Sequence, residues 1–334
     1  MSTVYDSVMD RRTFIGAVAA GIIAAPLASF AQQSLKVHRV GWLTTGSPSD
    51  GRDFIDELKK SLSDLGYSEG KNIVFDFRYS EGRPERLAGL AAELVALNPD
   101  VIISGATPGT RAAKQATETI PIIMIGVSDP VGAGFVASLA RPGRNITGVV
   151  NLGLDMAAKP LELLHTVVPK ATRIAVLVPD NPAIPAIVKA IQEAARSLRL
   201  TVLPTTVRTS DEIESAFASM VKEKSEALIV IADTVTMVNR KRIAELAAEA
   251  KLPAIYQYLP QVEAGGLFSY GPNPRDLEKL VASYIDKILK GAKPGDLPVQ
   301  QPTEFELVVN MKTAKALGIT FPPEILLRAD KVIQ

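Results

Sequence analysis

Hydroxyl, amide and carboxylate side chains recur in this sequence at short polar loops that follow apolar, β-branched stretches. The candidate binding residues in these loops are Thr45, Ser47, Ser104, Thr107, Ser128, Asp129, Asn181, Asp233 and Tyr256. Hydroxyls beside the free N–H groups of a helix N-terminus suit a carboxylate or another polar group. An aspartate suits an amine, and a tyrosine ring stacks on a flat molecule. The pattern predicts non-covalent binding of a small polar molecule, although the same residue types also cap helices.

One stretch offers a different chemistry, the binding of a dinucleotide. Gly132 to Ala137 matches Gly-x-Gly-x-x-Ala, and Asp155 follows where a ribose-binding acid would stand. However, the first glycine comes several residues after the preceding apolar strand, behind Pro130. The helix predicted from Val131 to Leu139 is also short. A dinucleotide-dependent enzyme is therefore the weaker alternative.

The residues that other enzyme and metal sites need are scarce. The chain has no cysteine and two histidines, and no group of His, Asp and Glu has metal-ligand spacing. No nucleophile elbow of the form Gly-x-Ser-x-Gly occurs. We therefore expect neither catalysis nor a cofactor nor a bound metal. Lys and Arg total 37 against 36 Asp and Glu, which gives no reason to expect nucleic acid as a partner.

Apolar strands alternate with amphipathic helices along most of the chain. The predicted strands are Val37 to Leu43, Asn72 to Tyr79, Asp100 to Ser104, Ile120 to Ile125, Asn145 to Val150, Arg173 to Val178, Leu200 to Val207, Ala227 to Ile231, Pro253 to Tyr258 and Gly265 to Gly271. This alternation predicts parallel sheets built from βαβ units. The order restarts near Arg173, so the fold class is α/β with two Rossmann-like lobes, and the ligand cleft lies between them.

The lobes are predicted to exchange chain more than once. We assign residues 37–148 and 273–330 to the first lobe and residues 149–272 to the second. The first crossing is predicted near Val149 to Leu154. Several connecting strands of this kind are typical of two lobes that close on a ligand by hinge bending.

The first 31 residues have the features of an export signal. Arg11 and Arg12 precede Phe14, an apolar region runs from Ile15 to Leu27, and small residues lead to a cleavage position near Ala31. The paired arginines favour twin-arginine export, and an ordinary secretory signal is the alternative. Either route predicts a soluble protein of the periplasm.

Several motifs resemble the substrate-binding proteins of ABC transporters, of the type that includes tryptophan- and tyrosine-binding members. They are Asp100 to Ile103, Ser128 to Gly132, Arg141 to Gly148, Gly271 to Asn273 and Leu327 to Ile333. The resemblance covers the chain after the signal. It implies a periplasmic-binding-protein type I-like fold, a solute held between the lobes, and an ABC permease of the inner membrane as partner.

The resemblance also implies a solute that is an aromatic or branched amino acid or a related carboxylate. We expect a monomer. A periplasmic ligand-sensing subunit that serves no transporter is the alternative function within the same fold.

Overall fold

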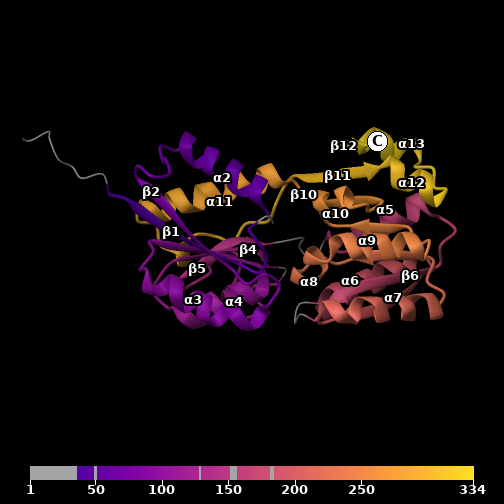
Figure 1. Cartoon of the computed structure of the whole chain (residues 1–334), viewed down its shortest axis with the longest axis horizontal. Helices are drawn as coiled ribbons and strands as arrows, with labels where there is room; N and C mark the ends of the chain where they lie inside the picture. The colour runs from indigo at the N-terminus through magenta and orange to yellow at the C-terminus, as the bar shows by residue number, and fades with distance from the viewer. Residues whose placement is uncertain (1–35, 49–50, 128, 151–155, 181–183) are drawn as a thin grey trace, which may run out of the picture.

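The computed structural model describes residues 36–334 except 49–50, 128, 151–155 and 181–183. These residues form two lobes that lie side by side, each built on its own β-sheet with helices on both faces (Figure 1). The C-terminus lies in the lobe opposite the one that holds the first strand. The α/β, two-lobed architecture predicted from the sequence is confirmed.

The first lobe has a five-stranded sheet in the order β2-β1-β3-β4-β5, and every neighbouring pair is parallel. Its strands are β1 His38–Thr44, β2 Ile73–Tyr79, β3 Val101–Gly105, β4 Ile122–Val127 and β5 Ile146–Val150. Its helices are α2 Arg52–Asp64, η1 Pro84–Arg86, α3 Leu87–Ala96, α4 Ala106–Ala116, α11 Pro274–Leu289 and η4 Pro294–Asp296. Helices α2 and α11 share one apolar cluster with the sheet, and α3 and α4 share another. The central strands are thus buried on both faces, which explains their continuous β-branched sequences.

The second lobe has a seven-stranded sheet in the order β12-β11-β10-β9-β8-β6-β7. Its strands are β6 Arg173–Pro179, β7 Thr201–Val207, β8 Ala227–Val230, β9 Ala254–Tyr256, β10 Phe268–Pro272, β11 Phe305–Asn310 and β12 Lys331–Ile333. All neighbouring pairs are parallel except β10 with β11.

Helices cover both faces of this second sheet. They are α5 Lys159–Val167, α6 Ile184–Ser197, η3 Ser210–Glu212, α7 Ile213–Lys222, α8 Thr234–Val238, α9 Arg240–Glu249, α10 Leu259–Glu263, α12 Met311–Leu317 and α13 Pro323–Arg328. Helices α5 and α6 pack with residues near the C-terminus in one apolar cluster, whereas α7 and α9 pack in the other.

The division of the C-terminal segment differs from the prediction. Helix α11 does return to the first lobe, where it packs against α2, and Gln300 bonds to the end of β5. The strands β11 and β12 then join the second sheet, so assigning residues 305–330 to the first lobe was wrong. The reason is that β10 offers a free edge, and Phe268–Pro272 pairs antiparallel with Phe305–Asn310 along its whole length.

The segments that cross between the lobes are hydrogen bonded to one another where they leave their sheets. The N–H of Asn273 donates to the carbonyl of Glu304 at 2.9 Å. The N–H of Val150 donates to the carbonyl of Gln300 at 3.0 Å, and the N–H of Gln300 donates to the carbonyl of Gly148 at the same distance. The first crossing itself falls largely on residues 151–155, outside the described residues. Short hydrogen-bonded crossings of this kind suit rotation of one lobe about the other.

The predicted helix from Val131 to Leu139 does not form. The segment is a series of turns, in which the N–H of Phe135 donates to the carbonyl of Pro130 and the N–H of Ala137 donates to the carbonyl of Pro142. Phe135 and Val136 are both buried in the apolar cluster with α3 and α4. Loop geometry therefore buries Phe135 and Val136, whereas Val131 is 43% exposed, and the two glycines disfavour a helix.

The predicted export signal, residues 1–31, lies outside the described residues. Within the part of the chain that the structure describes, no helix is both long enough and apolar enough to cross a membrane.

Candidate functional site

The polar loops of the first lobe meet at one edge of its sheet. Strand β3 lies between β1 and β4, and all three run in the same direction. Their carboxyl ends therefore bring Thr45, the Ser104–Thr107 loop and Asp129 to the same side of the lobe. Parallel sheets bind ligands at this edge. The predicted residue Ser47 is half-buried in the loop after β1, and Ser128 lies outside the described residues.

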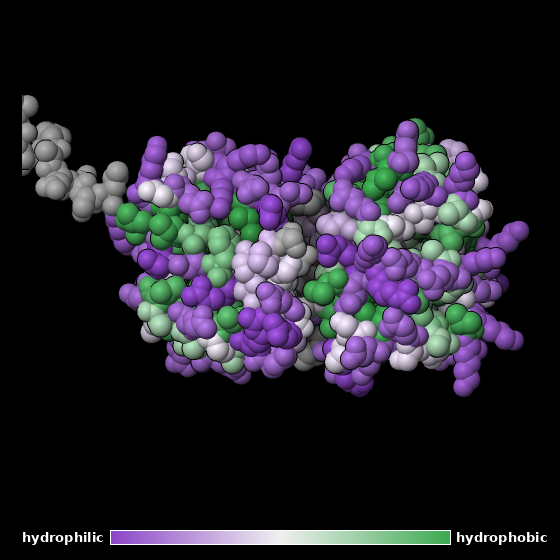
Figure 2. Space-filling view, in the orientation of Figure 1, coloured by the Kyte–Doolittle hydropathy of each residue, from purple (hydrophilic) through white to green (hydrophobic). Residues whose placement is uncertain are grey.

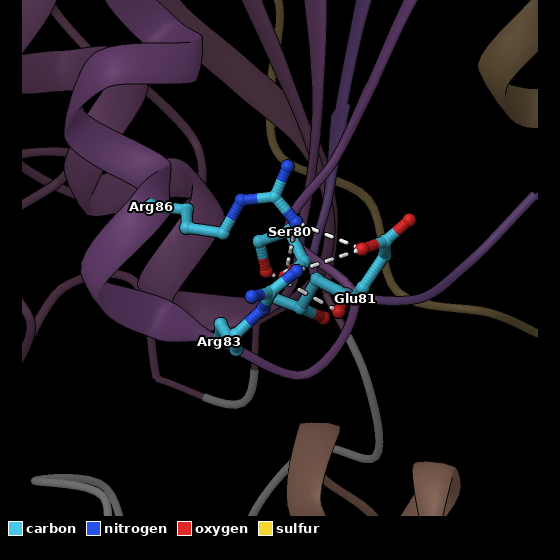
Figure 3. Close-up of polar contacts among 5 residues, drawn as sticks. Ser80, Glu81, Arg83 and Arg86 are labelled. Carbon is cyan, nitrogen blue, oxygen red and sulfur yellow. Dashed lines mark hydrogen bonds and ion pairs between the residues drawn. The ribbon is translucent and has the colours of Figure 1, made fainter.

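Thr45 is held by a turn that follows the neighbouring strand β2. Its carbonyl accepts hydrogen bonds from the N–H of Gly82 at 2.8 Å and from the hydroxyl of Ser80 at 3.3 Å. Arg83 and Arg86 both point toward Glu81 and donate to its carboxylate at 3.0 and 2.9 Å (Figure 3). The bonds from Arg86 and then Arg83 hold the pKa of the Glu81 carboxyl below its ordinary value. The turn thus fixes the loop that carries Thr45.

The second loop begins α4 directly after β3. The Oγ of Ser104 lies 2.9 Å from Oγ1 of Thr110, which itself donates to the carbonyl of Ala106 at 3.0 Å. Ser104 is therefore the donor to Thr110, and its fully buried hydroxyl ties strand to helix. Thr107 is buried one residue beyond Ala106, which has a left-handed φ of 56°. Backbone strain of this kind is common where a loop shapes a binding site.

The third loop begins with a bulge in β4. The register with β5 shifts between Ile125 and Val127, around Gly126 with a φ of 72°. Bulges at strand ends re-aim the residues that follow. The next aspartate, Asp129, accepts the N–H of Gly132 at 2.8 Å through Oδ1. The carboxylate of Asp129 thus closes its own turn, which gives it a structural role beside the predicted binding role.

The second lobe contributes Asp233, which caps α8. Its Oδ1 accepts the N–H of Thr234, and its own N–H donates to the hydroxyl of Thr236 at 2.9 Å. The other predicted residues of this lobe are placed less favourably. Asn181 lies outside the described residues, and Tyr256 is only 2% exposed in the apolar cluster with α7 and α9. Burial raises the pKa of the Tyr256 hydroxyl. In this structure Tyr256 is a core residue of the second lobe.

Both lobes line a cavity of about 290 Å³ between them. Its first-lobe wall comes from η1, α3 and α4, and its second-lobe wall comes from the ends of β6 and β8. The lining residues are Pro84, Leu87, Ala88, Thr107, Pro108, Arg111, Ala112, Gln115, Asp180 and Asp233. Seen from outside, the lobes meet along a narrow seam (Figure 2). This volume is close to the lower limit of the range for ligand sites, roughly 300–1,000 Å³.

Three polar residues of the cavity wall were not among the predicted site residues: Arg111, Gln115 and Asp180. Arg111 stands over the ring of Phe135, with 5.6 Å from its guanidinium carbon to the ring centroid. Arg111 lies four residues after Thr107, so helical spacing from a predicted residue was the available signal. Asp180 directly follows β6 and belongs to the same class of loop as the other candidates.

The seam also holds a direct hydrogen bond between the lobes that the sequence pattern did not predict. The hydroxyl of Thr234 donates to Oγ1 of Thr45 at 2.9 Å, and both side chains are buried. Thr45 was a predicted site residue, and Thr234 follows the predicted Asp233. No local signal pairs residues 189 positions apart.

The described residues lack the features of a dinucleotide or metal site. The glycines of the Gly-x-Gly-x-x-Ala match do not lead into a helix, so this motif supplies no helix N-terminus for a pyrophosphate. The described part of the chain has no group of three His, Cys, Asp or Glu side chains that could hold a metal ion.

Comparison with known proteins agrees with this geometry. The family model for ABC transporter substrate binding proteins matches residues 49–333. The tyrosine-binding protein of Clostridioides difficile (strain R20291) is 34% identical over 262 residues, which cover 78% of this chain and 75% of that protein.

Two solved structures differ informatively in how well they superpose. The ABC domain of Streptococcus pneumonia in complex with L-Trp is 30% identical, with a TM-score of 0.83 over 89% of this chain and 100% of that one. The ligand-free, open structure of a Clostridium difficile substrate-binding protein with adhesive properties is 29% identical at the same coverage, with a TM-score of 0.67. The present structure thus superposes better on the first than on the second.

The two sheets, the cleft between them and these relatives all agree with the periplasmic-binding-protein type I-like fold. The chain belongs to the family of ABC transporter substrate-binding proteins.

Proposed function

We propose that the protein is the solute receptor of an ABC importer in the periplasm. It binds one small amino-acid-like solute between its lobes and presents the closed form to a permease of the inner membrane. Family membership supports the receptor role. The observation that carries the proposal is the cavity of about 290 Å³, whose walls come from both lobes, because only a ligand that touches both lobes favours closure.

The wall of the cavity suits a zwitterion with an apolar side chain. Arg111 offers a cation for a carboxylate, whereas Asp180 and Asp233 offer carboxylates for an amine. Leu87 and Pro84 supply apolar surface. Tyrosine and tryptophan are the first solutes to test, since one relative is a tyrosine-binding protein and another was solved with L-Trp.

Calorimetry with L-tyrosine, L-tryptophan and branched amino acids tests the proposed solute class directly. Mass spectrometry of small molecules released by denaturing the purified protein tests the same class without a candidate solute having to be chosen in advance. We expect one amino acid to bind at one site per chain. Release of a solute that has no carboxylate, with no binding of any amino acid, would contradict the proposed class.

The charge of Asp233 is tested by Asp233→Asn. Asparagine keeps an oxygen that caps α8, so the helix stays formed while the negative charge is lost. We expect the amino acid to bind about 10- to 100-fold more weakly, the range for a lost hydrogen bond to a charged group. The control ligand is the matching carboxylic acid without its amine, whose affinity should not change. Equal losses for both ligands would remove Asp233 from the amine site.

Transport and location are tested in cells. We expect the protein in the periplasmic fraction, and replacing Arg11 and Arg12 by lysine should trap it inside if export follows the twin-arginine route. Uptake of the radiolabelled solute should be lost when the gene is deleted. Normal uptake in the deletion strain, beside intact binding in vitro, would favour a sensing subunit instead.

A further inference from the structure

Two contacts between the lobes lie next to each other at the seam. In the first, the hydroxyl of Thr234 donates to that of Thr45 at 2.9 Å. In the second, a Cβ built on Gly82 would lie 3.8 and 3.9 Å from the methyl carbons of Val238, so the two residues are in close apposition. Thr45 and Gly82 are themselves hydrogen bonded, and residues 234 and 238 are one turn apart on α8. The four residues form one contact, which we call the clasp.

The first-lobe side of the clasp is braced by contacts within its own lobe. The N–H of Glu81 donates to the carbonyl of Gly46 at 3.0 Å, and the Gly82 N–H donates to the carbonyl of Thr45 at 2.8 Å. Arg83 and Arg86 hold the Glu81 carboxylate beside this turn (Figure 3). Gly82 has a φ of 74°, a conformation that glycine adopts without cost. The turn therefore presents Gly82 and Thr45 in fixed positions.

The second-lobe side is braced as well. The capping box between Asp233 and Thr236 orients the first turn of α8, and the hydroxyl of Thr236 donates to the carbonyl of Ile231 at 2.9 Å. The five-residue helix α8 carries the hydroxyl of Thr234 and the apolar side chain of Val238 toward the other lobe. Val238 remains 41% exposed at the seam. Both halves are thus rigid, and little side-chain entropy is lost when they meet.

We propose that this clasp stabilises the closed arrangement of the ligand-free protein and thereby sets solute affinity through residues that need not touch the solute. The link to affinity rests on the proposed receptor function, whereas the effect on closure does not. The superpositions are consistent with it, because this structure matches the L-Trp complex with a TM-score of 0.83 and the open relative with 0.67 at equal coverage.

The clasp has a signature that a direct ligand contact lacks. The apparent dissociation constant equals the intrinsic one divided by the fraction of protein that is competent to bind. Removing the clasp lowers the closed fraction and should therefore weaken every solute by the same factor. A residue that touches the solute weakens one solute more than another. The loss of one hydrogen bond should raise the apparent dissociation constant of every solute by the same factor, about two- to tenfold.

The test uses single-molecule FRET on the ligand-free, full-length mature protein. The chain has no cysteine, so Glu93→Cys on α3 and Lys222→Cys on α7 give two unambiguous dye positions. Both helices lie on the side of the molecule opposite the segments that join α11 to β10 and β11 in Figure 1, so hinge opening about those segments would separate them. The clasp variant is Thr234→Val, which keeps the branched shape and removes the hydroxyl.

Two controls accompany the clasp variant. Thr234→Ser keeps the hydroxyl and should retain the closed population, while Thr201→Val makes the same exchange on exposed β7 away from the seam. We expect Thr234→Val alone to shift the distance distribution toward longer separations. An unchanged distribution, an equal shift in Thr234→Ser, or a wild-type protein that is entirely open without solute would overturn the proposal.

Affinity measurements separate this proposal from the receptor function. Calorimetry with two solutes that bind should show that Thr234→Val weakens the affinity for both by the same factor. Thr201→Val should leave both affinities unchanged. Unequal weakening would make Thr234 a direct ligand contact instead. If no amino acid binds, the receptor proposal fails, whereas the FRET result still decides whether the clasp holds the lobes closed.

Discussion

At the scale of single residues, the family-like motif from Arg141 to Gly148 acts chiefly by stabilising the fold. The side-chain amide of Asn145 donates to the carbonyls of Thr117 and Ile120, and the hydroxyl of Thr147 donates to the carbonyl of Leu297 at 2.7 Å. Gly148 lets β5 approach β4. These contacts hold the loop before β4 and the segment after α11 against the sheet edge. They position the candidate site without entering it.

Gly148 gives a direct test of this view. A Cβ at this position would lie 2.1 Å from the carbonyl oxygen of Met124, and the φ of 143° is one that other residues rarely adopt. We expect Gly148→Ala to lower the free energy of unfolding by about 2–4 kcal/mol through overpacking and backbone strain. Urea denaturation measures this loss.

Gly134→Ala is the matched control for that substitution. Gly134 also has a positive φ, 70°, but no atom lies within 4 Å of an added Cβ. Gly134→Ala should lower the free energy of unfolding by about 1–2 kcal/mol, because only the strained backbone conformation opposes it. Equal losses in the two variants would show that the close approach to Met124 contributes nothing.

At the scale of elements, the packing of α11 on α2 buries an acid. Glu278 on α11 is 5% exposed, and burial together with the negative charge of Glu57 on α2 raises the pKa of its carboxyl to about 7. The positive charges of Arg275, Lys60 and Lys279 oppose this shift. The helix that returns to the first lobe therefore carries a group that titrates near neutral pH.

This predicts a pH-dependent stability. The folded protein holds the Glu278 proton more tightly than the unfolded chain, whose carboxyl has a pKa near 4.5. The stabilisation is complete below pH 4.5 and is lost as the pH rises through 7. Glu278→Gln removes the charge, so it should stabilise the protein at pH 8 by about 1–2 kcal/mol after allowance for solvent screening, and hardly at all at pH 4.5.

Chemical denaturation at several pH values measures that difference. Glu193→Gln at an exposed ion pair of α6 is the control, and it should change the free energy of unfolding by no more than about 0.5 kcal/mol. A Glu278→Gln variant whose advantage is the same at pH 4.5 and pH 8 would contradict a raised pKa in the folded protein.

At the scale of the whole molecule, two separate sheets suggest two units that unfold semi-independently. Each lobe has its own apolar clusters on the two faces of its sheet. The crossings and the seam connect them. A solute that binds both lobes must therefore couple their unfolding, because neither lobe alone holds the complete site.

Differential scanning calorimetry tests this coupling. At a free solute concentration of 100 times Kd, binding should stabilise the folded state by about 2.7 kcal/mol. We expect the solute to raise the unfolding temperatures of both lobes together and to merge the two unfolding transitions into a single, sharper one. A shift confined to one lobe would contradict a site shared between them.

The amino-acid sequence by itself determined the elements and their class. Repeating apolar patterns are local, so ten of the twelve strands that the structure describes were predicted to within a few residues. The polar loops that follow β1, β3 and β4 were likewise predicted to carry candidate binding residues, and the strand order then showed that they share one edge of the sheet. The turns from Val131 to Leu139 escaped this reasoning, because burial of Phe135 outweighed helical spacing.

Tertiary structure decided what depends on contacts between distant residues. Pairing with β10 placed β11 and β12 in the second lobe, although sequence order suggested a return to the first. The buried environment of Tyr256, the engagement of Ser104 with Thr110, and the bond between Thr45 and Thr234 likewise follow from packing. Local pattern shows where a polar side chain occurs along the chain. Its role is set by the partner that folding brings to it, and that partner can be 189 residues away.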